Sequence, residues 1–419
     1  MNVRDFLRAG HWPTLLAAFV YFDISFLVWV LLGGLSNHIA ADLELTHTQR
    51  GLLVATPLLG GALLRIVLGL LTDRVGARRT ALIGLSSTLL PLVIGWLWAD
   101  SFPQLLCIGL LLGVAGASFA AALPMAGRWY PPQYQGLALG IAGAGNSGTA
   151  LATFFAPRLA ELVGWKNVFG LAAIPVLAAL LVVLLLAREA PNTSSPQPVF
   201  RYFRVLRERD SWWLCGFYAV TFGGFVGLAS FLNTFYRTQY GVHPVVAGNL
   251  ATIAVLAGSF LRPVGGYLAD RFGGVRILTL IYGLVAVILT ALACHPSVTV
   301  TTVLFTGTLG LLGMGNGAVF QLVPQRFPRE LGVITGLIGA AGGLGGFFLP
   351  TSLGLLRDYT GSYAGGLAAF AVISLASAAA IVHITRAWYG IYIRTGGLAT
   401  ASIEPLASAP AILATGEES

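Results

Sequence analysis

Two arginines stand inside long apolar segments, at matching positions in the two halves of the chain. Arg65 precedes Asp73 by eight residues, and Arg262 precedes Asp270 by the same spacing. At 1.5 Å per helical residue, each guanidinium would lie roughly 12 Å inside a membrane. An arginine at the bilayer centre costs at least about 2.5–3.5 kcal/mol, so each needs a reason to be there. Guanidinium groups offer forked donors to planar oxyanions, and two of them facing one cavity predict a site for a small anion.

A buried acid is the alternative partner for these arginines. Asp23, in the first apolar segment, is the only clear acid at depth, so at most one arginine could be neutralised in this way. Asp23 could instead be a proton-coupling carboxylate. An organic carboxylate or a phosphate ester would also satisfy two arginines by charge. The expected aromatic and glycine-rich lining favours a small, flat, singly charged ligand.

The composition indicates a chain that lipid solvates. Fifty-six percent of the residues are apolar and 10% are charged, whereas soluble domains average about 25% charged residues. The formal charge of +8 does not indicate a nucleic-acid partner, because the basic residues lie in short runs between apolar segments, as membrane loops do. The lipid bilayer is therefore the expected partner of most of the surface.

Twelve segments have the length of about 20 residues that a membrane helix needs. They are expected to begin near Thr14, Gly51, Thr80, Gln104, Leu137, Val168, Trp213, Val246, Ile277, Val298, Gly332 and Gly365. We expect an N-terminal six-helix bundle at 1–187, a basic cytoplasmic linker at 188–211, a C-terminal six-helix bundle at 212–394 and a disordered tail at 395–419. Most arginines then fall in segments on one side of the membrane, which predicts that both termini are cytoplasmic.

The two halves repeat each other in sequence. Arg65, Gly69, Asp73-Arg74 and Gly76 recur at the same spacing as Arg262, Gly266, Asp270-Arg271 and Gly273, and Gly113 to Pro124 parallels Gly313 to Pro324. A duplicated six-helix unit predicts an all-α membrane protein of two pseudo-symmetric bundles around a central cavity. Such bundles can rock to expose the cavity to either side.

The segment from Gly69 to Arg79 resembles the loop motif between the second and third spans of the major facilitator superfamily. The resemblance implies a twelve-helix transporter with a cytoplasmic gating latch that favours the outward-facing state. In this sequence the latch would comprise Gly69, Asp73, Arg74, Gly76 and Arg78, with a weaker second copy at Asp270, Arg271 and Gly273. The alternative is that these arginines only set the topology.

Two glycine-rich segments resemble the signature of the nitrate/nitrite porter family within that superfamily. They run from Gly140 to Gly148 and from Gly336 to Gly345, and Gly315–Phe320 and Tyr218–Phe225 are also typical of the family. The resemblance implies an anion site formed by Arg65, Arg262, Tyr218, Asn146, Phe222, Gly143 and Gly339, with Phe26 or Phe22 as the opposing ring. The sequence departs from the family where Gly342 stands in the register of Asn146, and at Asp23.

These features predict a monomeric, multi-pass inner-membrane transporter of nitrate, nitrite or both, by nitrate/nitrite antiport or proton-coupled symport. A small organic carboxylate is the alternative cargo. A membrane sensor with a transporter fold is a third hypothesis, disfavoured because neither terminus has room for a signalling domain. An enzyme is not expected, because Asp23 and the two arginines have no nucleophile–base pair beside them. We expect no cofactor and no metal site.

Overall fold

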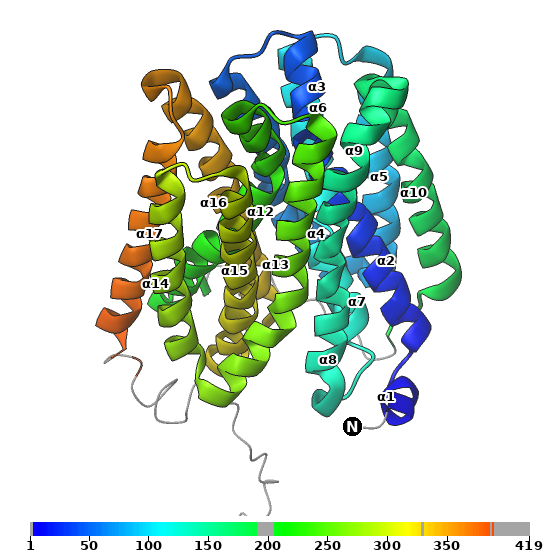
Figure 1. Ribbon diagram of the computed structural model, residues 1–419. Coiled ribbons are helices and arrows are strands. Elements are labelled where there is room, and N and C mark those ends of the chain that lie inside the picture. Colours follow the sequence, from blue (N-terminus) through cyan, green and yellow to red (C-terminus); the bar gives the residue numbers. More distant parts are fainter. Residues whose placement is uncertain (1–2, 191–204, 328–330, 386–387, 389–419) are drawn as a thin grey trace, which may run out of the picture.

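The computed structural model describes residues 3–190, 205–327, 331–385 and 388. They form helices joined by short turns (Figure 1). The first half contains α1 (Val3–Ala9), α2 (Trp12–Trp29), α3 (Leu31–Asp42), α4 (His47–Val75), α5 (Ala77–Trp98), α6 (Phe102–Gly116), α7 (Phe119–Gly127), α8 (Pro132–Gly143), the 3-10 turn η1 (Ala144–Ser147), α9 (Gly148–Val163) and α10 (Trp165–Leu186). The second half contains α12 (Arg209–Tyr240), α13 (Pro244–Phe272), α14 (Gly274–Ala293), α15 (Val298–Arg326), α16 (Leu331–Thr360) and α17 (Ala364–Ile384).

The twelve-span fold expected from the apolar segments is confirmed. In the described part of the chain, eleven helices or joined helix pairs are long and apolar enough to cross a membrane. The other span is α8 and α9, which η1 joins and interrupts. The chain is therefore a multi-pass membrane protein. Part of the expected linker, 191–204, and the expected tail, 395–419, lie outside the described residues.

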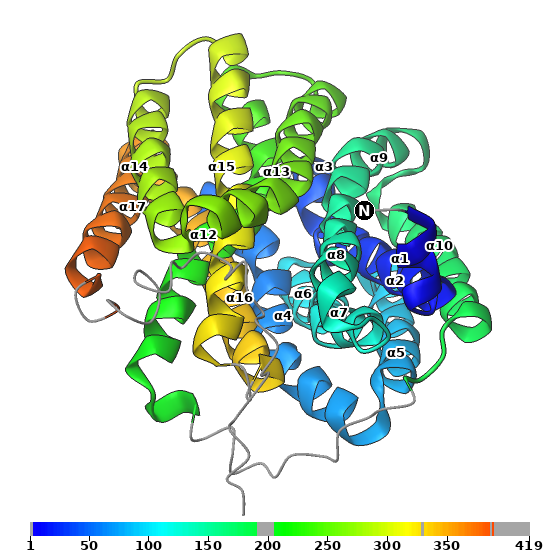
Figure 2. The same ribbon diagram turned by 90° about the horizontal axis from the view of Figure 1, so that it is seen from below.

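The first six spans lie on one side of the molecule and the last six on the other (Figures 1 and 2). We call the face at which α1 lies the terminus face, at the bottom of Figure 1, and the other the opposite face. The division into bundles at 1–187 and 212–394 remains our proposal. Helix α12 begins at Arg209, three residues before the expected start of the second bundle.

The sequence repeat appears as a repeat of backbone geometry. Gly76, the residue after α4, has φ +98°, and Gly273, the residue after α13, has φ +93°. Residues with a side chain rarely adopt this conformation, which explains why glycine recurs at both positions. Gly113 and Gly313 likewise both face the backbone of a crossing helix, at Gly60 and Gly258, respectively.

Several hydrogen bonds between the halves lie toward the opposite face. Ser36 Oγ and Thr234 Oγ1 are 2.8 Å apart, and the Asn37 amide donates to the Asn233 carbonyl at 2.9 Å, so α3 is joined to α12. Asp358 at the end of α16 accepts hydrogen bonds from the first turn of α4. Near the terminus face, the ion pairs among the described residues join helices of the same half. The two halves are thus fastened to each other at the opposite face.

Candidate functional site

Arg65 is buried where the two halves meet. Its side chain projects from α4 and is 1% exposed. Nε donates to the carbonyl of Gly116 at 3.1 Å within the first half, and Nη1 donates to the carbonyl of Gly339 on α16 in the second. Nη2 is buried and finds no partner in the part of the chain that the structure describes. A cation at membrane depth thus retains an unused donor, although an unpaired buried donor is costly.

Three aromatic rings surround the Arg65 guanidinium. Its central carbon lies 5.2 Å from the ring centroid of Trp29, 5.4 Å from that of Phe119 and 5.0 Å from that of Phe222. These rings come from α2, α7 and α12. Ring faces attract a cation, and all three rings are nearly or fully buried. They therefore stabilise the guanidinium without a counter-anion and exclude water from it.

Arg262 and Tyr218 complete the cationic group from the second half. Arg262 lies 5.9 Å from the centroid of Phe320, and its Nη1 is buried and unpaired among the described residues. The ring of Tyr218 stacks on Phe222 at 5.0 Å and meets Phe320 edge-on at 5.0 Å. Its hydroxyl is close enough to interact electrostatically with both arginines, but it makes no hydrogen bond of acceptable geometry in the described part of the chain.

The site therefore presents donors in excess of acceptors. Arg65 Nη2, Arg262 Nη1 and the Tyr218 hydroxyl are each buried and have no hydrogen-bond partner among the described residues, and Tyr218 lies close enough to both arginines to interact with their charges. Buried polar atoms are almost always hydrogen-bonded in native structures. A cluster of unused donors with two positive charges is what a small anion requires.

The two glycines predicted for the site have different surroundings. The Gly339 carbonyl accepts from Arg65, and a Cβ there would lie 3.3 Å from Nη1, so a side chain would crowd the guanidinium. Gly143 is buried at the end of α8, and a Cβ there would meet no atom within 4 Å. The structure brings Gly339 to the arginine cluster and leaves Gly143 beside open space.

Asn146 lies in η1, the turn that interrupts the fifth span. This turn packs against α2 and against α13, the helix that carries Arg262. Asn146 is fully buried, and neither polar atom of its amide has a partner among the described residues. Asn316 on α15, which we had not singled out as a site residue, shares both properties. Both asparagines thus carry buried amide groups without a partner in the described part of the chain.

Phe119 and Trp29 are two rings at Arg65 that were not predicted from the sequence. Phe26 packs edge-on to Phe22 at 4.5 Å and lies 6.4 Å from Phe222, while Phe119 and Phe222 both contact the guanidinium of Arg65. A role for Phe26 or Phe22 as the opposing ring remains a prediction. The available signal was the position of Phe119 within the repeated segment Gly113–Pro124.

Asp23 is held by the start of α9. Ser147 Oγ donates to Oδ1 at 2.6 Å, and the backbone of Gly148 also hydrogen-bonds to the carboxylate. No ion pair of Asp23 is present in the described residues. Neither Arg65 nor Arg262 is therefore paired with this acid in the described part of the chain.

The residues of the expected latch form contacts within their own half. Asp73 accepts from Arg128 at 3.0 Å. Arg78 donates to the Leu184 carbonyl at 2.9 Å, while Arg74 and Arg271 are exposed. A Cβ at Gly69 would approach only Ala120, at 3.9 Å, and Asp270 hydrogen-bonds with Gln321. Their role as a gating latch remains a prediction.

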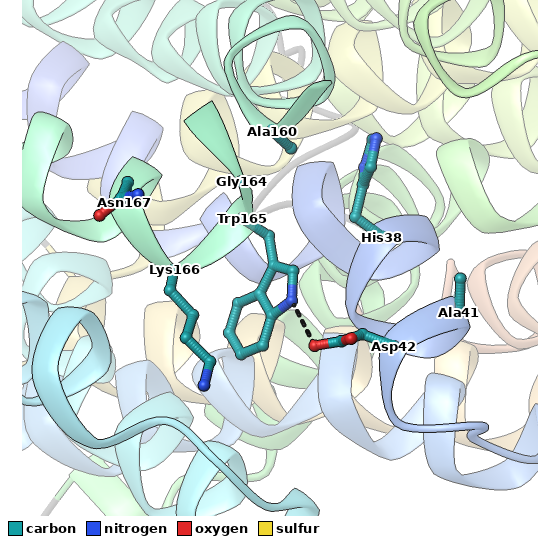
Figure 3. Close-up of a pocket in the computed structure, with 8 residues that line it drawn as sticks. All are labelled: His38, Ala41, Asp42, Ala160, Gly164, Trp165, Lys166 and Asn167. Carbon is teal, nitrogen blue, oxygen red and sulfur yellow. Dashed lines mark hydrogen bonds between the residues drawn. The ribbon is translucent and has the colours of Figure 1, made fainter. Parts of the chain in front are cut away.

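A surface pocket of about 630 Å³ lies on the opposite face, around Trp165 and Lys166 (Figure 3). The Trp165 indole donates to Asp42 at 3.0 Å, and Lys166 Nζ lies 2.5 Å from Asp100. These two pairs both lie within the first half, and the arginine cluster is not part of the pocket lining.

Comparison with known proteins agrees with the geometry. Residues 17–350 match the model of the Major Facilitator Superfamily. The "Nitrite extrusion protein" of Bacillus subtilis (strain 168) is 35% identical over 353 residues, covering 84% of this chain and 89% of the relative. The "Probable nitrate/nitrite transporter NarK2" of Mycobacterium tuberculosis is 37% identical over 341 residues, covering 80% and 86%. Among solved structures, a D-xylose-proton symporter aligns with a TM-score of 0.73 at 14% identity, covering 92% of this chain and 99% of the symporter.

Proposed function

Because this chain belongs to the Major Facilitator Superfamily and, within it, to the nitrate/nitrite porter family, we propose that it carries nitrate, nitrite or both across the bacterial plasma membrane by alternating access. Both termini would lie in the cytoplasm, so the terminus face is the cytoplasmic one, and the unit would be a monomer. The observation that carries the proposal is the set of buried donors on Arg65, Arg262 and Tyr218 that have no partner in the part of the chain that the structure describes.

The proposed site matches the chemistry of the anion. Nitrate and nitrite are planar, and their oxygens accept the in-plane donors that a guanidinium offers. Arg65 and Arg262 would bind from opposite halves, and Tyr218 would add a hydroxyl donor. Phe119 and Phe222, which both contact Arg65, would flank the ion with flat surfaces. A larger carboxylate would need space that these buried rings occupy.

The positive charge of the two arginines links anion binding to the movement of the two halves. With an empty site, Arg65 and Arg262 face each other with no acid paired to Arg65 among the described residues, and like charges in a medium of low dielectric constant repel. An anion reduces that repulsion and bonds to both halves. Reorientation of a loaded carrier is then favoured over that of an empty one, which is the requirement for exchange.

Nitrate/nitrite exchange is the coupling mode that this arrangement favours over proton symport. A symporter needs a titratable group whose protonation alters the site, and Asp23 contacts Ser147 and Gly148 rather than either arginine. A relative from Thermus thermophilus, 31% identical over 378 residues, is described as a "Probable nitrate/nitrite antiporter NarK1". We therefore assign Asp23 the role of positioning η1 and α9.

Anion uptake into proteoliposomes tests the proposal. We expect uptake of labelled nitrate when the vesicles contain nitrite, little uptake when they are empty, and loss of uptake in Arg65→Lys, since lysine cannot bind two oxygens with a rigid fork. Lys166→Arg, on the opposite face, is the matched control and should transport normally. Uptake driven by a pH gradient into empty vesicles would contradict exchange, and uptake of small carboxylates in place of either ion would contradict the assigned substrate.

A further inference from the structure

A second pocket, of about 380 Å³, lies between the start of α5 and the end of α10 on the terminus face. Three arginines and one acid line it: Arg78, Arg79, Arg188 and Glu189. None of these belongs to the proposed nitrate site. The pocket therefore carries an excess of positive charge, and two of its arginines, Arg79 and Arg188, belong neither to the proposed site nor to the predicted latch.

The single acid of this pocket is already engaged. One oxygen of Glu189 accepts the backbone N–H of Arg78 at 2.9 Å and that of Arg79 at 3.2 Å. The carboxylate thus caps the first turn of α5, where a helix favours negative charge. Neither Arg79 nor Arg188 forms an ion pair with any described residue, and both are exposed. Two guanidinium groups remain available for a ligand.

The backbone that carries Arg188 is fixed on both sides. Its N–H donates to Thr14 Oγ1 at 2.9 Å, and its carbonyl accepts from the Trp129 indole at 3.1 Å. Arg78 is also held, since one of its nitrogens donates to the Leu184 carbonyl at 2.9 Å and its Nε is buried without a partner in the described part of the chain. Hydrogen bonds therefore hold the Arg188 backbone and the Arg78 side chain in place, although Arg78 lies at the start of α5 and Arg188 just after the end of α10.

The apolar part of the lining identifies the kind of ligand. Leu184 is 48% exposed and Leu185 is 70% exposed, and both belong to the last turn of a membrane span. Exposed leucines at the end of a membrane span lie at the level where the acyl chains of the lipids meet their head groups. Arginines next to exposed leucines thus match a molecule with a phosphate at one end and hydrocarbon at the other.

We propose that this pocket binds the head group of an anionic phospholipid, with Arg79 and Arg188 on the phosphate and Leu184 and Leu185 along the acyl chains. Basic pockets between membrane helices on the cytoplasmic side suit such head groups. The assignment of the inner leaflet rests on the proposed orientation, but head-group binding itself does not. Inorganic phosphate shares the charged part of this chemistry and lacks the hydrocarbon.

Native mass spectrometry of the detergent-purified protein tests the proposal. Phosphatidylglycerol is the probe, with phosphatidylcholine and inorganic phosphate as the comparison arms. We expect retention of phosphatidylglycerol, and a loss of affinity of at least about fivefold in R79Q/R188Q, from the contribution of surface arginines to anionic-lipid binding. The matched control is R8Q/R276Q, which removes two exposed arginines elsewhere on the terminus face and should bind as the unmodified protein does.

A second variant keeps the proposal testable if the arginine variant does not fold. Leu185→Asn leaves the guanidinium groups in place and should weaken phosphatidylglycerol binding without affecting inorganic phosphate. Equal loss in the two arginine variants would indicate general surface charge and overturn the site. Competition by inorganic phosphate at equal strength would overturn the lipid assignment. Because no transport is measured, failure here is distinct from failure of nitrate exchange.

Discussion

Asp358 fastens the second half to the first by capping a helix that belongs to the first. Its carboxylate accepts the backbone N–H of His47 at 3.2 Å, that of Thr48 at 2.7 Å and the hydroxyl of Thr48 at 2.5 Å. All three donors belong to the first turn of α4, where unpaired N–H groups and the helix dipole favour a negative charge. We predict that Asp358→Ala shifts the protein toward the state that is open at the opposite face.

The size of the shift follows from these contacts. Hydrogen bonds to a charged group contribute about 1.5–3 kcal/mol when buried, and the interaction with a helix terminus adds about 0.3–1 kcal/mol. Asp358 is exposed, so in the variant water can form some of the hydrogen bonds that the carboxylate formed. We therefore expect a net cost of about 1.5–2 kcal/mol, which changes the ratio of the two states by roughly 10- to 30-fold.

A distance measurement between spin labels on the two halves can detect this shift. Leu162 on α9 and Val303 on α15 are 78% and 66% exposed, so labels attached there disturb little packing. The cysteine pair would be introduced after replacement of Cys107, Cys215 and Cys294. In Asp358→Ala, the fraction of molecules with a long distance between the two labels should increase.

Asp100→Ala is the matched control for the spin-label experiment. Asp100 is also an acid on the opposite face, but it pairs with Lys166 of its own half at 2.5 Å. Its loss should leave the distance distribution unchanged. If Asp358→Ala and Asp100→Ala gave the same distribution, the helix cap would not hold the two halves together, and the reasoning would be refuted.

Three further predictions concern the site and its supports. Tyr218→Phe keeps the ring stacked on Phe222 but removes one donor to a charged ligand, so the KM for nitrate should rise by about 10- to 100-fold; an unchanged KM would exclude the hydroxyl from the site. Asp23→Asn should retain exchange at both pH 6 and pH 8 in a counterflow assay, because an amide oxygen still accepts from Ser147; loss of activity in a normally folded variant would instead implicate the carboxylate. Gly76→Ala should destabilise the protein by about 1–2 kcal/mol through its positive φ, measured by thermal unfolding, whereas Gly140→Ala, where a methyl group meets open space, should not.

The twelve spans could be predicted because length and hydropathy are properties of the sequence itself. The positions at which the helices break within the spans could not be predicted. The first span divides at Val30 and the fourth at Ala117, while the fifth is interrupted by η1. Each break lies in an apolar or glycine-rich run that would suit a continuous helix equally well, and packing against neighbouring helices decides between the two.

The charged part of the site was predictable for a similar reason. An arginine in an apolar run is conspicuous, and Arg65 and Arg262 repeat at equal spacing. Phe119 and Trp29 carried no such signal, because one aromatic residue among many apolar ones is ordinary in a membrane helix. Only the folded arrangement reveals that their rings face Arg65.

The hydrogen bond from Arg65 to the Gly339 carbonyl has a consequence for the release of cargo. This carbonyl is an oxygen acceptor supplied by the other half, and it is chemically a stand-in for one oxygen of a bound anion. A main-chain carbonyl is present whatever residue occupies the position, so substitution cannot remove the acceptor itself, although a side chain at Gly339 would crowd Arg65. In the proposed site, this carbonyl would therefore compete with the anion for Arg65. In the proposed mechanism a bound anion would take the place of the carbonyl on Arg65 while the loaded carrier reorients, and the carbonyl would regain Arg65 once the anion has left.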